Sequence, residues 1–176
     1  MRVPDAGWTA RLARYRVALG FLTAAATIVL ARPTWQTWRV GLIVALAGEV
    51  VRMWAAGHLE KGREVTRSGP YRLMRHPLYA GSAVVATGVV IACWSAIVAT
   101  LVLAYLAVTL TAAIRTEEAF LARTFGDAYD RYRESRDEPM QRRFSVVRAA
   151  RNREYRAAAG LVAGFALLAL KAGRYL

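Results

Sequence analysis

Three groups of polar residues in this sequence have the types and spacing to do chemistry. The first lies in the segment 66–81, which reads TRSGPYRLMRHPLYAG. Its notable side chains are Tyr71, Arg75, His76, Pro77 and Tyr79. Proline suits the first turn of a helix, so a helix should begin at Pro77, and its free N–H groups together with Arg75 could hold a carboxylate. A basic loop whose tyrosines anchor at lipid headgroups would explain the same composition.

The second group is the acidic pair Glu117 and Glu118, two residues after Arg115. Such carboxylates could bind a cation, a ribose hydroxyl or an amino group. At the C-terminus of a helix each would oppose the helix dipole by about 0.3–1 kcal/mol. That cost falls if the helix continues to Phe125. The alternative is a solvated pair neutralised by Arg115 and Arg123.

The third group is Glu49 with Arg52, inside the apolar segment 40–57. Each charge would cost roughly 2.5–3.5 kcal/mol at the centre of a bilayer. The i,i+3 spacing puts both side chains on one face of a helix, where they can pair. The pair should therefore face the interior of a helix bundle. A structural ion pair and a direct contact with a ligand both remain open.

The composition indicates the elements that must position these groups. The chain has 176 residues, 56% of them hydrophobic, and a net charge of +13. Residues 78–114 contain no Asp, Glu, Lys or Arg, a run of 37 residues. A soluble domain of this size cannot bury such a run, so the sequence indicates an integral membrane protein rather than a soluble nucleic-acid binder. The single cysteine, Cys93, excludes an internal disulfide and a cysteine-based metal site, and no metal is expected.

The apolar segments predict an all-α bundle of about five transmembrane helices. A bilayer core needs about 20 helical residues, whereas the run 78–114 would extend roughly 55 Å as one helix. It should therefore form a helical hairpin that turns near residues 93–95. The other predicted spans are 17–31, 40–57 and 157–170. The whole chain, 1–176, is then a single membrane domain with cytoplasmic helical segments.

The distribution of positive charge predicts the orientation. With these five spans, 20 of the 25 Lys and Arg residues fall on one side of the membrane and 4 on the other, and Arg52 lies within a span. The positive-inside rule places the N-terminus and the polar segments 59–77 and 115–155 in the cytoplasm. The basic run 142–156 is typical of an amphipathic helix on anionic membrane lipids. Nucleic acid is not an expected partner.

Two motifs carry a resemblance to a known family. They are Gly69-Pro-Tyr with Arg75-His-Pro-Leu-Tyr79-Ala-Gly81, and Glu117-Glu118 with Leu121, Phe125-Gly126, Tyr129 and Tyr132. In this order, separated by a helical hairpin, they resemble the isoprenylcysteine carboxyl methyltransferase family, whose relatives include phospholipid N-methyltransferases. The similarity covers about residues 49–132, the core motif region. It implies a membrane enzyme that takes a methyl group from S-adenosylmethionine (SAM).

The resemblance also implies roles for individual residues. The cofactor pocket would be lined by Val65, Thr66, Tyr71, His76, Pro77, Leu78, Tyr79, Gly81 and Glu117. The catalytic residues would be Arg75, Arg115 and Glu118. Arg75 or the adjoining helix start would hold the carboxylate of SAM, and Arg115 or Arg52 would orient an anionic acceptor.

The expected acceptor is a lipophilic carboxylate such as that of a prenylcysteine. An α-carboxyl group has a pKa of about 3.3–3.7 and is already ionised at neutral pH, whereas an amine of pKa near 10 would need a base. His76 would be a poor thermodynamic match for that task. Phospholipid amines and lipophilic thiols remain open as acceptors, as does the oligomeric state. The alternatives to a methyltransferase are an NADPH-dependent membrane reductase and a non-catalytic, lipid-binding membrane adaptor.

Overall fold

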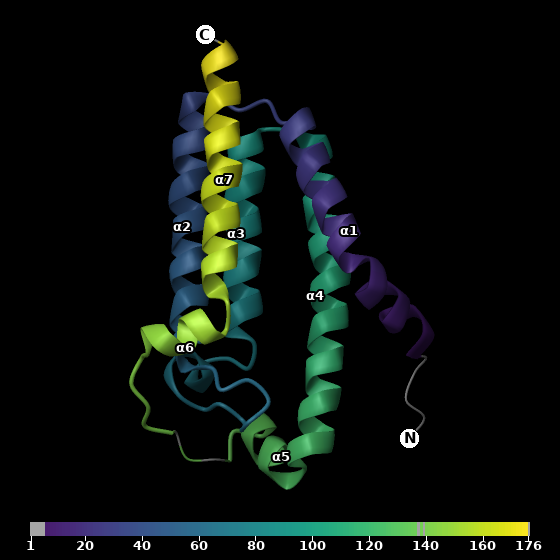
Figure 1. Cartoon of the computed structure of the whole chain (residues 1–176), viewed down its shortest axis with the longest axis vertical. Helices are drawn as coiled ribbons and strands as arrows, with labels where there is room; N and C mark the ends of the chain where they lie inside the picture. Colours follow the sequence, from purple (N-terminus) through teal and green to yellow (C-terminus); the bar gives the residue numbers. More distant parts are fainter. Residues whose placement is uncertain (1–5, 137, 139, 176) are drawn as a thin grey trace.

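The computed structural model describes residues 6–136, 138 and 140–175, and the regular secondary structure of these residues is entirely helical (Figure 1). The elements in chain order are α1 (Ala6–Leu30), α2 (Trp35–His58), the 3-10 turn η1 (Gly69–Arg72), α3 (Pro77–Cys93), α4 (Ala96–Phe125), α5 (Asp127–Arg133), α6 (Val146–Arg151), α7 (Glu154–Ala172) and the 3-10 turn η2 (Gly173–Tyr175). Residues 1–5, the start of the predicted cytoplasmic arm, lie outside the described residues.

The long helices form two groups. Helices α2, α3 and α7 run side by side, while α1 lies along α4 (Figure 1). The short elements η1, α5 and α6 gather at one end of the molecule, drawn at the bottom of Figure 1. The two polar segments that carry the candidate chemistry therefore meet at one end.

Within the described part of the chain, three helices are long and apolar enough to cross a membrane: Trp35–His58, Ala96–Phe125 and Glu154–Ala172. Two further apolar helices, Ala18–Leu30 and Pro77–Cys93, are shorter. The chain is thus an all-helical integral membrane protein. Five spans and their orientation remain predictions.

The predicted hairpin of 78–114 is present as α3 and α4. Its turn is at Trp94, which adopts the left-handed conformation with φ 45°, and the Ser95 hydroxyl accepts a hydrogen bond from the backbone N–H of Val98 to begin α4. Pro77 occupies the first turn of α3, as its position predicts. Helix α4 continues to Phe125, so the acidic pair lies inside a helix and not at its end.

Helices α2 and α3 approach closely because small residues face one another. A Cβ built on Gly88 would lie 2.5 Å from the carbonyl oxygen of Gly41, and one on Gly48 would lie 2.8 Å from that of Gly81. Small residues let helix backbones pack closely in a membrane, where no hydrophobic effect draws helices together. This contact fixes the start of α3, and with it His76, relative to α2.

A charged cluster joins α2, α3 and α7. Arg52 Nε lies 3.4 Å from Glu49 Oε2, and Arg52 Nη2 lies 2.5 Å from Glu154 Oε1. Arg52 also donates a hydrogen bond to the Ser82 hydroxyl. These contacts favour the structural interpretation of the Glu49–Arg52 pair, because the guanidinium is engaged from three helices.

The basic run 142–156 does not form one amphipathic helix. It divides into α6 and the start of α7, with Arg153 between them in the left-handed conformation. Two of its arginines turn toward the protein, because Arg148 Nε donates to Glu60 at 2.8 Å and Arg142 Nη1 lies 2.6 Å from Glu64. The prediction of one helix over 142–156 is wrong, and contact of this run with anionic lipids stays a prediction.

Candidate active site

The centre of the candidate site is His76, which lies between the two carboxylates of the acidic pair. His76 Nε2 is 3.1 Å from Glu118 Oε1, and Nδ1 is 3.7 Å from Glu117 Oε2. Arg75 Nη1 reaches the same Glu118 oxygen at 3.1 Å. The two motifs, some 40 residues apart in sequence, therefore meet in space. The acidic pair is not neutralised by Arg115 and Arg123, the alternative that the sequence left open.

Tyrosine side chains surround this centre. The Tyr79 ring stacks on the His76 ring with centroids 5.7 Å apart, and its hydroxyl hydrogen-bonds to Glu117. Tyr71 is buried in η1. The Tyr132 hydroxyl donates to the Tyr71 carbonyl at 2.9 Å. Helix α5 thereby fixes η1 beside the end of α4.

The electrostatics of the cluster favour a protonated histidine. The Glu117 carboxylate, and after it that of Glu118, raises the pKa of His76 above its ordinary value of 6.5, against the effect of burial. Burial raises the pKa of Tyr132 to about 12, so its hydroxyl stays a neutral donor to Tyr71. Burial and the neighbouring Glu117 carboxylate also raise the pKa of Tyr71.

The segment between α2 and η1 carries two further predicted residues, Val65 and Thr66, and both are buried. The Thr66 hydroxyl accepts a hydrogen bond from the Glu60 backbone N–H at 3.2 Å. Ser68 is paired with His58, with 3.1 Å between the hydroxyl and Nδ1. The segment is thus tied to the end of α2.

The end of α2 is in turn held by residues far along the chain. Asn152 Nδ2 lies 2.9 Å from the carbonyl oxygens of both Ala56 and Leu59. Arg148 Nη1 donates to the Gly57 carbonyl at 2.5 Å, and Arg142 Nη1 donates to that of His58 at 3.3 Å. The last carbonyls of a helix have no partner within the helix, and cations at this end also interact favourably with the helix dipole. These supporting residues were not predicted, because nothing in the sequence links 142–152 to residues 56–59.

Two predicted site residues lie away from the cluster. Arg115 is exposed on α4, and no ion pair joins it to Glu118 in the part of the chain that the structure describes. Gly81 lies in the contact of α3 with α2, where an added Cβ would be 2.6 Å from Arg52 Cγ. Its observed role is helix packing. The remaining predicted residues, Pro77 and Leu78, form the first turn of α3 next to His76.

The chain is similar to known proteins over the region that carries most of these residues. The sequence profile of the family described as phospholipid methyltransferase matches residues 15–128. Probable protein-S-isoprenylcysteine O-methyltransferases from Oryza sativa, subspecies indica and japonica, are 34% identical over 139 residues, covering 68% of this chain and 71% of theirs. The chain belongs to this family of membrane methyltransferases.

A bacterial protein is also similar to this chain. The cobalt-zinc-cadmium resistance protein CzcN of Cupriavidus metallidurans is 34% identical over 125 residues, or 65% of this chain. The match spans 56% of the length of CzcN. No solved structure matches the chain significantly. The profile match includes the first motif and the second motif as far as Gly126. It ends before Arg142, Arg148 and Asn152, so the residues that hold the end of α2 lie beyond it.

Proposed function

We propose that this methyltransferase transfers the methyl group of SAM to a lipophilic acceptor at the cytoplasmic face of the membrane. The observation that carries the proposal is the convergence of His76, Tyr79 and Glu117, which brings the two motifs together at one end of the helix bundle. A site at a membrane boundary can receive a polar donor from water and an apolar acceptor from the bilayer.

The chemistry of the side chains suits this donor. SAM supplies an electrophilic methyl group on a sulfonium ion, beside an amino-acid carboxylate and an adenosine. The Glu117 side chain is 35% exposed, so its oxygens can accept hydrogen bonds from ribose hydroxyls or an amino group. The aromatic faces of Tyr71 and Tyr79 favour a cation. Arg75, 44% exposed, has donors left for a carboxylate beyond its contact with Glu118.

The acceptor that we propose is a carboxylate, as in a prenylcysteine. Both ring nitrogens of His76 face carboxylates, so this side chain is engaged and is not free to take a proton from an amine. A carboxylate is already deprotonated at neutral pH and needs no base. The contribution of the protein is then to align donor and acceptor and to exclude water, effects worth roughly 7–11 kcal/mol in well-oriented reactions.

Binding of radiolabelled SAM to the full-length purified protein tests the donor site. We expect saturable binding that Glu117→Gln weakens about tenfold or more, because a charged hydrogen-bond acceptor is lost. The matched control is Glu134→Gln, since Glu134 pairs with Arg136 at the end of α5, outside the cluster. Unchanged affinity in the Glu117 variant would contradict the site.

A methyl-label assay tests the acceptor. The proposal predicts label on a prenylated cysteine with a free carboxylate and none on the corresponding amide. Label on phosphatidylethanolamine instead would be consistent with the proposed SAM site but would contradict the proposal of a carboxylate acceptor.

A further inference from the structure

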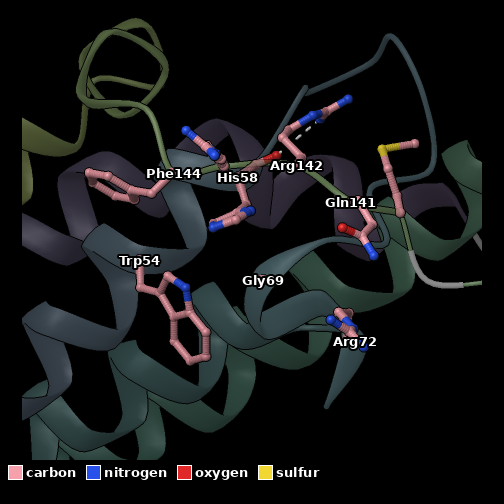
Figure 2. Close-up of a pocket in the computed structure, with 9 residues that line it drawn as sticks. Trp54, His58, Gly69, Arg72, Gln141, Arg142 and Phe144 are labelled. Carbon is pink, nitrogen blue, oxygen red and sulfur yellow. Dashed lines mark hydrogen bonds between the residues drawn. The ribbon is translucent and has the colours of Figure 1, made fainter.

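A cavity lies beside the end of α2, between η1 and the segment 140–144 (Figure 2). Its volume is about 540 Å³. None of the residues predicted to hold the methyl donor lines it. We propose that this cavity is a binding site for an anionic phosphate group, separate from the methyl-transfer site.

The charge of the lining carries the proposal. Among the residues that the structure describes, three arginines line the cavity, Arg72, Arg142 and Arg143, and no Asp or Glu does. Arg142 is paired with Glu64, which fixes its guanidinium at the cavity edge. Arg72 and Arg143 are exposed and make no ion pair with any described residue. Two guanidinium groups that no described carboxylate pairs therefore line one space, and their donors match phosphate oxygens.

The cavity is also built on a fixed floor. Gly69 has a φ of +57°, and a Cβ there would lie 2.5 Å from the His58 ring, so only glycine lets η1 pass this close. His58 is held in turn by the Ser68 hydroxyl. Gln141 lies across the cavity from these residues and adds an amide donor (Figure 2).

The position of the cavity indicates where the phosphate comes from. Trp54 lines the cavity in the last turns of α2 and is 41% exposed, and Phe144, which also lines it, is 45% exposed. Tryptophan with an exposed edge at the end of a membrane helix is typical of the headgroup region. The phosphate of an anionic bilayer lipid and free inorganic phosphate share the chemistry that this lining recognises, and the experiment below separates these two sources.

The test uses the full-length protein in vesicles that contain either brominated phosphatidylglycerol or brominated phosphatidylcholine. Bromine quenches nearby tryptophan, and the difference from Trp54→Phe isolates the signal of Trp54. We expect several-fold stronger quenching by phosphatidylglycerol, because the choline group is repelled by the arginines. We also expect this preference to fall as salt rises.

Variants identify the groups responsible. Arg72→Gln with Arg143→Gln should reduce the lipid preference to about one, and each single change should reduce it in part. The control pair is Arg123→Gln with Arg133→Gln, two exposed arginines outside the cavity lining, and it should keep the preference. Equal quenching by both lipids in the unaltered protein, or a preference that survives in the double variant, would overturn the lipid source.

A final arm adds inorganic phosphate to phosphatidylcholine vesicles and follows Trp54 emission. A saturable change that needs Arg72 and Arg143 would support the phosphate site and assign it a soluble ligand. A lipid preference without that change assigns the site to bilayer lipid. If the protein shows no lipid preference and its Trp54 emission does not respond to phosphate, the proposal is overturned.

Discussion

At the scale of single residues, His76 joins the two motifs of the site. It is the residue before the first turn of α3, and its ring lies between two carboxylates supplied by α4. The imidazolium form is compatible with both contacts, because each nitrogen can then donate toward an oxygen. The protonation state of one side chain therefore affects how α3 and α4 are held together at this end.

The first prediction concerns pH. Because the folded protein raises the pKa of His76, the stabilisation from its charged form is full below the unfolded value of about 6.5 and is lost as pH rises through the higher folded value. The thermal unfolding midpoint of the protein should exceed that of His76→Gln most below pH 6.5. The difference should shrink at higher pH. A difference that grows with rising pH would contradict this electrostatic account.

The types of the site residues were predictable from the sequence, but several of their partners were not. The clustering of His76, Tyr79 and Glu117 follows from a hairpin whose two ends must return to the same membrane face. The pairing of Glu154 with Arg52 does not, because α7 could have packed elsewhere and only tertiary structure brings residues 102 positions apart together. The predicted roles of Arg115 and Gly81 came from motif position alone, which does not tell which face of a helix meets the site.

At the scale of helices, the close contact of α2 with α3 depends on glycine. We predict that Gly88→Ala lowers the free energy of unfolding by about 1–3 kcal/mol, because the new Cβ would lie 2.5 Å from backbone atoms of Gly41 and Ala45. Gly164→Ala on α7 is the matched control, since a Cβ there meets nothing within 4 Å. Thermal or denaturant unfolding followed by circular dichroism would measure both. Equal effects of the two changes would argue against the close packing.

The end of α2 gives a second prediction at this scale. Asn152→Ala should destabilise the protein by about 1–3 kcal/mol, because the carbonyls of Ala56 and Leu59 lose a shared donor. Asn152→Asp keeps the shape but cannot donate, so it should be no milder than the alanine change. Unfolding of the unaltered protein and of both variants in one detergent would measure these differences in stability. An aspartate variant as stable as the original protein would show that the amide donor is unimportant.

The helices themselves could be predicted well. The charge-free run 78–114, Pro77 at a helix start and the expected turn at residues 93–95 all correspond to α3 and α4. The basic run 142–156 was misinterpreted because its periodic apolar residues suggest one helix, whereas Glu60 and Glu64 draw two of its arginines inward. Long-range ion pairs of this kind leave no mark on local periodicity.

At the scale of the whole molecule, the candidate site and the phosphate cavity lie at the same end as η1, α5 and α6 (Figure 1). The other end holds the loop between α1 and α2, which contacts the α3–α4 turn through the Arg32 N–H and the Cys93 carbonyl, 2.7 Å apart. The excess of positive charge is at the first end. The positive-inside rule therefore predicts that both sites face the cytoplasm.

Cysteine labelling tests this orientation. In a Cys93→Ala background, Gln36→Cys should react with a membrane-impermeant maleimide added to intact cells, and Arg133→Cys should react only after the cells are opened. Both positions are exposed, one at each end of the bundle. The reverse pattern would invert the topology and place the methyl-donor site on the outer face.

The cap that residues 142–152 place on α2 has a consequence for biosynthesis. The end of helix α2 leaves the ribosome more than 80 residues before Arg142, Arg148 and Asn152 do, and translation at about 5–20 residues per second makes that interval several seconds or more. During that time the carbonyls at the end of α2 are exposed and the segment between α2 and η1 is not anchored. A protein truncated before Arg142 should insert into the membrane and still never mature into an enzyme.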